Sequence, residues 1–198
     1  IEVGTAFGDV LTKNSTLECL ELRGNRLGDE GIIDFARQLR LNTVLRYINF
    51  SNNQLSQESV VAFGRALKEN TSLETLILDY NKLKNCDQGL IDILKSSSAL
   101  KNLSLNKTDL GKEEIKALAK GLSLNSTLEG LSLAENNFTD EIVKEFGEAI
   151  SDRYQLKTIN LLSNPLFLGD FSQNVQDTLI YRQILCNNIR TSIYSPLT

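Results

Sequence analysis

The stretch LECLELRGNRL, residues 17–27, decides the fold of this 198-residue chain. It fits the pattern L-x-x-L-x-L-x-x-N-x-L, and further copies follow at residues 45–55, 73–83, 100–110, 128–138 and 156–166. The copies are spaced by 28, 28, 27, 28 and 28 residues, and all 24 apolar positions hold Leu, Ile or Phe. A fixed period of this length indicates that one supersecondary unit is stacked on the next along the chain.

Each copy is predicted to contain a short β-strand, because apolar and polar residues alternate at its centre. Leu20 and Leu22 then face the core while Glu21 faces the other side, and stacked copies form a parallel sheet with about 4.8 Å between strands. The residue three positions after the strand pattern is expected to hold the turn, since an Asn amide both donates and accepts hydrogen bonds. These turn positions are Asn25, Asn53, Asn81, Thr108, Asn136 and Asn164. Threonine offers a single hydroxyl, so the fourth turn is expected to be the loosest.

Between the strands the apolar residues change to a helical period. Ile32, Phe35, Ala36 and Leu39 follow the i, i+3, i+4, i+7 spacing of an amphipathic helix, and the spacing returns in later copies. The small residue of each quartet is expected where the helix approaches the sheet most closely: Ala36, Gly64, Ala119 and Gly147. An asparagine three residues before the strand pattern is expected to be a left-handed helix C-cap, at Asn14, Asn42, Asn70 and Asn125.

Helices about 10 Å apart cannot stack straight beside strands about 4.8 Å apart, so the array is expected to bend into a horseshoe with the strands inside. Residues 1–168 are predicted to form a partial first repeat and six strand-bearing repeats. Residues 169–198 are predicted to form a capping helix and a tail that cover the last open core face. The partial first repeat indicates a fragment of a longer chain.

The strand pattern, the 28-residue length and the following helix resemble the ribonuclease-inhibitor type of leucine-rich repeat over residues 1–168. The resemblance implies an α/β solenoid, a right-handed horseshoe with a parallel sheet on its concave face and helices on its convex face. It also implies a protein partner bound on the concave sheet. It does not imply one function, because that family includes inhibitors, immune-receptor sensor regions, small-GTPase activators and actin-regulator scaffolds.

Exposed strand positions with apolar or aromatic side chains are the candidate contact residues, because nothing in the fold requires them to be apolar. Together with neighbouring charged and polar positions they give a predicted partner-binding set of Arg23, Tyr47, Asn49, Ile77, Asp79, Tyr80 and Lys107. Ser104, Ser132 and Ala134 in later copies are small, so binding is expected to concentrate in the first three strand-bearing repeats.

Composition argues against several classes of function. The chain contains no histidine, which excludes Ser-His, Cys-His and His-metal chemistry. Cys19, Cys86 and Cys186 have no metal-ligand spacing and are expected to be reduced thiols, so no metal, cofactor or disulfide framework is predicted. Carboxylate pairs such as Asp29/Glu30 come where helices begin, which favours an interaction with the helix dipole over acid–base catalysis. The chain is therefore predicted not to be an enzyme.

The same reasoning limits the partners. A net charge of −4 argues against nucleic acid, and no apolar run of about 18 residues exists to span a membrane. The leading hypothesis is a cytoplasmic module that binds a protein. Two alternatives remain: a small-GTPase activator acting through Arg26, Lys82 and Lys107, and a regulatory or sensor region of a larger immune-receptor-like or effector protein. The open N-terminal edge of a truncated array is a candidate for self-association.

Overall fold

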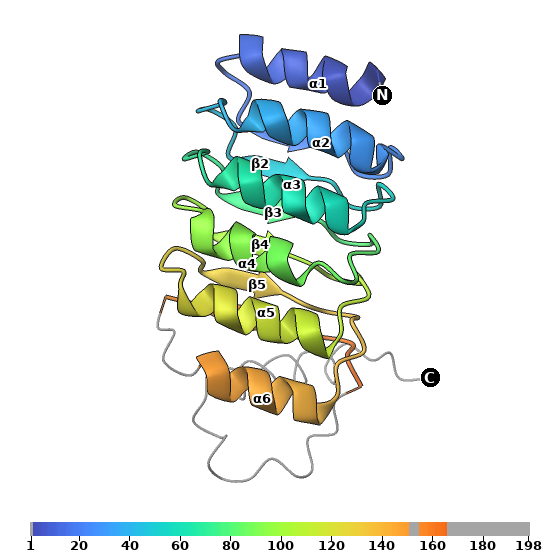
Figure 1. Cartoon of the computed structure of the whole chain (residues 1–198), viewed down its shortest axis with the longest axis vertical. Helices are drawn as coiled ribbons and strands as arrows, with labels where there is room; N and C mark the ends of the chain where they lie inside the picture. Colours follow the sequence, from blue (N-terminus) through green and yellow to red (C-terminus); the bar gives the residue numbers. More distant parts are fainter. Residues whose placement is uncertain (1, 151–154, 166–198) are drawn as a thin grey trace, which may run out of the picture.

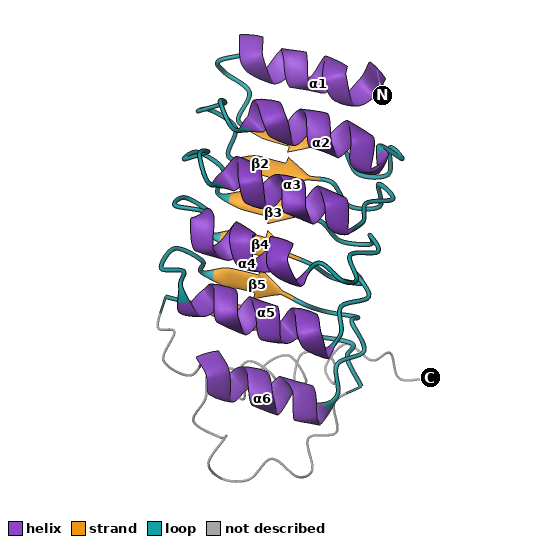
Figure 2. Ribbon diagram, viewed as in Figure 1, coloured by secondary structure: helices purple, strands orange, loops and turns teal. Residues whose placement is uncertain are grey.

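A computed structural model describes residues 2–150 and 155–165 of the chain. Helices and strands alternate along it, and the helices lie in one layer on one side of the strands (Figures 1 and 2). The elements in chain order are α1 (Glu2–Lys13), β1 (Cys19–Glu21), α2 (Gly28–Leu39), β2 (Tyr47–Asn49), α3 (Gln57–Leu67), β3 (Thr75–Ile77), α4 (Asp87–Ser96), β4 (Asn102–Ser104), α5 (Lys112–Ser123), β5 (Gly130–Ser132), α6 (Asp140–Ile150) and β6 (Thr158–Asn160).

The six strands form one parallel sheet in the order of the sequence, as the repeat predicts. Neighbouring strands pair at equivalent positions of the pattern, so that Leu20 lies beside Ile48 and Ile48 beside Leu76. The shorter spacing at the fourth copy does not shift this register, because Leu76 still pairs with Leu103. The missing residue is therefore absorbed outside the strands.

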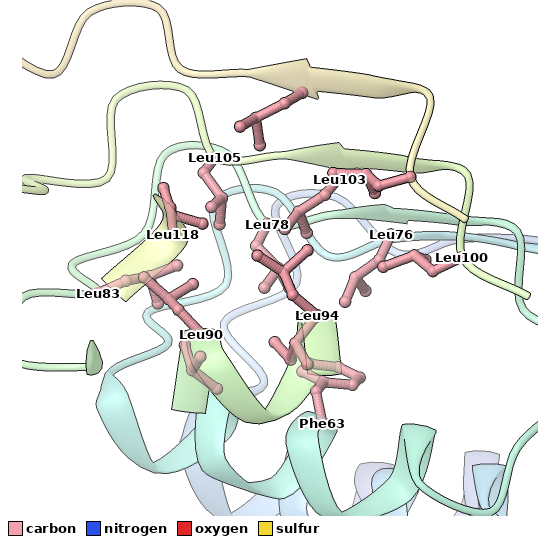
Figure 3. Packing of buried hydrophobic residues seen from close by; sticks show 14 of the residues in the cluster. Phe63, Leu76, Leu78, Leu83, Leu90, Leu94, Leu100, Leu103, Leu105 and Leu118 are labelled. Carbon is pink, nitrogen blue, oxygen red and sulfur yellow. The ribbon is translucent and has the colours of Figure 1, made fainter. Parts of the chain in front are cut away.

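The core lies between the sheet and the helices and follows the predicted alternation. Ile48 and Leu78 are fully buried, whereas Tyr47 and Ile77 are half-buried on the other side of the sheet. In Figure 3 leucines of the strands and leucines of α4 point toward one another. Phe35 of α2 meets Phe50 edge-to-face, with 4.9 Å between ring centroids. The packed interior is continuous along the array, because each repeat covers the apolar face of the one before it.

In five of the six turns an asparagine follows the strand and bonds within its own turn, and all but the first also join repeats. The Oδ1 atom of Asn53 accepts hydrogen bonds from the backbone N–H groups of Asn25 (3.0 Å) and Leu27 (3.3 Å) in the preceding repeat. Its Nδ2 group donates to the carbonyl oxygens of Leu22 (2.8 Å) and Phe50 (3.0 Å). Asn81, Asn136 and Asn164 make the same kinds of bonds to the repeats before them. Each side-chain amide thus satisfies backbone N–H and carbonyl groups of its own turn and of the turn before it.

Thr108 interrupts this ladder. Its hydroxyl donates to the carbonyl oxygen of Leu105 (2.7 Å) in its own turn, but it has no amide oxygen to accept from Asn81 and Leu83 of the preceding repeat. The N–H of Leu83 donates instead to the backbone carbonyl of Thr108 (3.0 Å). The hydrogen bonds between the third and fourth strand-bearing repeats are therefore fewer at this edge than at the other turns.

The expected left-handed C-caps are wrong. Asn14, Asn42, Asn70 and Asn125 do not adopt a positive φ. Instead, the Oδ1 atom of Asn42 accepts from the N–H groups of Val44 (3.0 Å) and Leu45 (2.7 Å), and its Nδ2 group donates to the carbonyl oxygen of Leu11 (2.9 Å). Asn70 and Asn125 do the same with their neighbours. Side-chain hydrogen bonds thus direct the chain from the helix toward the next strand. Because these asparagines also bond to the preceding repeat, they form a second ladder of hydrogen bonds at the opposite end of the strands.

The small residue of the helix is at a close contact, but the contact is not with the sheet. A Cβ atom added to Gly64 of α3 would lie 2.9 Å from the Cβ of Asp92 and 3.3 Å from the carbonyl oxygen of Gly89 in α4. A Cβ added to Gly89 would lie 3.0 Å from the backbone nitrogen of Val61. The two glycines let neighbouring helices approach each other, which corrects the expectation of a helix–sheet contact.

The predicted capping helix within 169–198 lies outside the described residues, as does the boundary at residue 168. The partial first repeat predicted before the first strand contributes the helix α1. Among the described residues, no helix combines the length and apolarity needed to cross a bilayer.

Candidate protein-binding surface

The six helices of the described residues lie on one side of the sheet, so within this part of the chain the strands present their other side as an open face (Figure 2). We call this side the open face; it carries the first and third residues of each strand and the turn after it. Tyr47 and Asn49 lie on β2 and Ile77 ends β3. The other four predicted contact residues lie in the turns after the strands: Arg23 after β1, Asp79 and Tyr80 after β3, and Lys107 after β4.

Three of the predicted residues come together around one aromatic ring. The guanidinium carbon of Arg23 lies 5.4 Å from the centroid of the Tyr80 ring, and the Nζ atom of Lys107 lies 5.5 Å from it. Tyr80 is 42% exposed, one of few large apolar side chains of the described residues with that exposure. A cation within about 6 Å of an aromatic face is attracted by the ring quadrupole. The arrangement is an exposed aromatic group between two positive charges, which we call the Tyr80 cluster (Arg23, Tyr80, Lys107).

The backbone at Tyr80 is in a conformation that does not suit tyrosine. The equivalent position of each repeat has a positive φ, which is 77° at Gly24, 54° at Asn52 and 58° at Tyr80, and 51–57° at Lys107, Glu135 and Ser163. Glycine and asparagine tolerate this left-handed region, but a bulky side chain there costs about 1 kcal/mol or more. The turn would therefore be more stable with a smaller residue. Because the conformation recurs at this position of every repeat, it belongs to the turn; what distinguishes Tyr80 is its exposed aromatic ring.

Asp79 and Asn49 use their side chains within the open face. Asp79 accepts hydrogen bonds from the hydroxyl of Ser104 (2.7 Å), the backbone N–H of Asn106 (2.8 Å) and the Nδ2 group of Asn106 (3.0 Å). The Oδ1 atom of Asn106 extends this network by accepting a hydrogen bond from the hydroxyl of Ser132 (2.7 Å). Asn49 accepts from the N–H and the hydroxyl of Ser51 (3.0 and 2.6 Å). These side chains order the surface, and the sequence pattern gives no sign that they are engaged in this way.

Tyr47 is separate from the Tyr80 cluster in its interactions. Burial, together with a hydrogen bond to the negatively charged Glu21, raises the pKa of the Tyr47 hydroxyl to about 12. The hydroxyl therefore remains protonated at neutral pH, with the Glu21 carboxylate as its electrostatic neighbour.

A hollow of about 410 Å³ lies on the open face over β3 to β6. Small side chains line it, among them Ser104, Gly130 and Ser132, and Ile77 and Leu162 add apolar surface. Of the predicted contact residues only Ile77 lines it. The expectation is that binding concentrates in the first three strand-bearing repeats; this hollow lies mainly over the later ones, where Ser104 and Ser132 are among the small side chains that line it.

Charged residues form a further row that the predicted set does not include. The residue before each strand alternates in charge through the array: Glu18, Arg46, Glu74, Lys101, Glu129 and Lys157. Glu74 pairs with Lys101 (2.8 Å) and Arg46 (3.0 Å), and Lys157 pairs with Glu129 (2.8 Å). The hydrogen bond from Lys101 is the main cause that holds the pKa of Glu74 below its usual value. The alternation is visible in the sequence once the repeats are aligned.

The carboxylates at helix starts act as caps. Asp29 of α2 accepts from the N–H of Ser56 (2.9 Å) and the N–H of Ser59 (3.2 Å) at the start of α3. Burial acts to raise the pKa of Asp29, but these bonds and those from the two serine hydroxyls outweigh it, so that the pKa is lowered. Glu114 of α5 accepts from the N–H groups of Asn85 (2.7 Å) and Gly111 (2.8 Å). Both carboxylates are engaged as hydrogen-bond acceptors of backbone N–H groups, which suits capping and not proton transfer.

The thiols differ in environment. Cys19 is exposed on β1, whereas Cys86 is buried, and burial raises its pKa well above the ordinary value for a thiol. Cys186 lies outside the described residues. Within the described part of the chain, no group of three or more His, Cys, Asp or Glu side chains could hold a metal ion.

Comparisons with known proteins agree with this fold. Residues 13–36 and 124–147 match one leucine-rich-repeat family model, and residues 44–66 match a second. No curated protein matches the chain at a significant level.

Two solved structures resemble the chain. Actin-binding site 2 of leiomodin-1 has a TM-score of 0.60 at 19% identity, over 75% of this chain and 89% of that chain. The C-terminal domain of a Caenorhabditis elegans tropomodulin has a TM-score of 0.61 at 14% identity, over 77% and 93%. The molecule is therefore a leucine-rich-repeat solenoid, with its sheet on the concave face and its helices on the convex face. Repeats of this kind are in general protein-interaction modules and not enzymes.

Proposed function

We propose that this chain is a non-catalytic, cytoplasmic module of the ribonuclease-inhibitor type of leucine-rich repeat that binds a protein partner through the open face of its sheet. The 28-residue spacing of the strands supports the assignment to that type. The observation that carries the binding function is Tyr80, an exposed aromatic side chain held in a left-handed backbone conformation between two cations. An exposed aromatic side chain that the core does not require is best explained by a role in binding.

The order of the open face supports the same function. Asp79, Ser104, Asn106 and Ser132 are joined by hydrogen bonds across three strands, and Asn160 extends the chain of bonds by donating to Ser132 (2.9 Å). Side chains that are already held lose little conformational entropy when a partner binds. The face is therefore suited to tight contact without reorganisation.

The experiment compares a doubly substituted face with a matched control. The variant Tyr80→Ser with Arg23→Gln removes the aromatic ring and one charge from the open face. Arg65→Gln removes one charge from the exposed side of α3, where Arg65 has no ion pair within the described residues. Partners captured from native lysate on the wild-type chain by photo-crosslinking should be lost from the double variant and kept by the control. Full retention by the double variant would overturn binding through this face.

Two named partners are tested as arms of the same experiment. Filamentous actin is included because one of the similar structures is an actin-binding site of leiomodin-1. Nucleotide-loaded small GTPases are included because Arg26 is exposed at a turn after β1, with a φ of 53° and no ion pair in the described part of the chain. Cosedimentation with actin, or faster phosphate release from a GTPase that is lost in Arg26→Ala, would name the partner.

A further inference from the structure

The Tyr80 cluster contains a charged group without a counter-charge. The guanidinium of Arg23 lies over the Tyr80 ring, and it forms no ion pair with any carboxylate of residues 2–150 or 155–165. An aromatic face holds a guanidinium but leaves its N–H donors available at the edge of the plane. Those donors form a fork that matches the two oxygens of a carboxylate.

The nearby carboxylates of the open face are already used. Asp79 accepts three hydrogen bonds from Ser104 and Asn106. Glu21 interacts electrostatically with Tyr47, and Glu135 pairs with Lys107 at 3.3 Å. Among the described residues no carboxylate pairs with Arg23, and a carboxylate of a partner molecule fits its N–H donors.

The cluster is also held in position before any partner binds. Arg23 belongs to the first strand-bearing repeat and Tyr80 to the third, so the arginine reaches across the second repeat, where the equivalent turn residue is the small Asn52. Stacking on the ring restricts the long side chain of Arg23, which reduces the entropy that it loses on pairing. Lys107 contacts the same ring, so two positive charges lie close together in the turns that follow the strands.

From this geometry we propose that the Tyr80 cluster is the docking point for an acidic segment of the partner protein. One carboxylate of the segment pairs with Arg23 in a bidentate arrangement beside the Tyr80 ring. A second carboxylate pairs with Lys107, whose ion pair with Glu135 is exposed and is worth little in water. This inference rests on the proposed function, because it names the chemistry by which the open face recognises its partner.

The test uses the full chain and a synthetic acidic probe. The octapeptide acetyl-Asp-Glu-Asp-Glu-Asp-Glu-Asp-Glu-amide is titrated into labelled protein, and the Nε–H resonance of Arg23 and the ring resonances of Tyr80 are followed by NMR. The matched probe is the octapeptide in which every Asp and Glu is replaced by Asn and Gln. We expect saturable shifts with the acidic peptide alone, and weaker binding at high salt because the contacts are exposed.

Three substitutions distinguish binding at the Tyr80 cluster from general electrostatic attraction to the protein surface. Arg23→Gln should raise the Kd of the acidic peptide by about tenfold, since a charge-assisted bidentate pair is lost. Arg23→Lys should recover only part of the affinity, because an ammonium group cannot make the forked contact. Arg65→Gln, the matched loss of one charge on the helical side, should leave the Kd unchanged.

The result that overturns the inference is equal shifts with both peptides, no shifts at Arg23 and Tyr80, or an equal effect of Arg23→Gln and Arg65→Gln. Its failure is distinct from failure of the proposed function. If the acidic peptide does not bind while the cross-linked partner is still lost from the double variant, the face binds its partner through other chemistry. If that partner is kept by the double variant, the proposed function fails as well.

Discussion

Exchanging the turn residues of two repeats tests the role of the asparagine ladder. Thr108→Asn supplies the amide that the fourth turn lacks, and Asn53→Thr removes it from the second turn. Asn53 is fully buried and links the first two strand-bearing repeats by its Oδ1 and Nδ2 atoms, whereas Thr108 bonds to Leu105 of its own turn through a hydroxyl. The two substitutions should therefore change stability in opposite directions.

The magnitudes follow from the bonds gained and lost. In Thr108→Asn, the new Oδ1 atom can accept from the N–H of Asn81 and the new Nδ2 group can donate to the carbonyl of Leu78. Two added hydrogen bonds at about 0.5–1.5 kcal/mol each predict a gain of about 1–3 kcal/mol in the free energy of unfolding. In Asn53→Thr, the half-buried N–H of Leu27 loses its acceptor, which predicts a loss of about 2 kcal/mol.

Urea unfolding followed by circular dichroism measures both variants, and amide hydrogen exchange shows whether protection changes across the altered turn. Thr71→Asn, the same replacement at an exposed position outside the ladders, serves as the control. A neutral or destabilising Thr108→Asn, together with an Asn53→Thr that changes stability by less than about 0.5 kcal/mol, would refute the reasoning. The amides would then be satisfied equally well by water.

Further predictions concern one residue each. Asp29→Asn should destabilise the chain by about 1 kcal/mol at pH 7, because Asn cannot accept at both side-chain atoms at the start of α3. Because folding lowers the pKa of Asp29, its contribution to stability is complete above about pH 4 and is lost as the pH falls through the folded-state pKa. The melting temperatures of variant and wild type should therefore converge in acid. A difference in melting temperature that does not change with pH would contradict this. Gly89→Ala should cost about 1–3 kcal/mol in chemical denaturation, because its Cβ would lie 2.9 Å from the Cγ1 of Val60; an unchanged midpoint would show that α3 and α4 can separate freely. Tyr80→Asn should melt within a few degrees of the wild type, because relief of about 1 kcal/mol of backbone strain offsets the lost cation–π contacts, whereas a large drop in calorimetry would make Tyr80 a structural residue.

The fold could be predicted because its signal is local and repeated. A strand of three residues cannot bury its apolar side alone, so the same pattern every 28 residues requires each unit to cover the next. What failed was the interpretation of Asn42 and Gly64. The side chain of Asn42 bonds to Leu11 of the preceding repeat, and Gly64 contacts the neighbouring helix, so both roles depend on which groups the stacking brings beside them.

For the candidate site, too, part could be predicted from the sequence and part depends on contacts between repeats. Alternation along the strand correctly predicted that Tyr47 and Ile77 are accessible on the open face. The alternation could not show that the Asp79 carboxylate accepts hydrogen bonds from residues of the next repeat. Nor could it show that Arg23 contacts the Tyr80 ring two repeats away. Such contacts join side chains of different repeats, and the length of each side chain and the backbone angle of each turn decide them.

The sequence by itself determined the solenoid, the register of its sheet and the side of each strand that faces the core, because these follow from apolar periodicity and the need to bury it. Only the tertiary structure decided which polar groups are satisfied within the array and which remain available to a partner. Hydrogen bonds and cation–π contacts depend on distances between atoms of neighbouring repeats, and a one-dimensional pattern does not contain those distances.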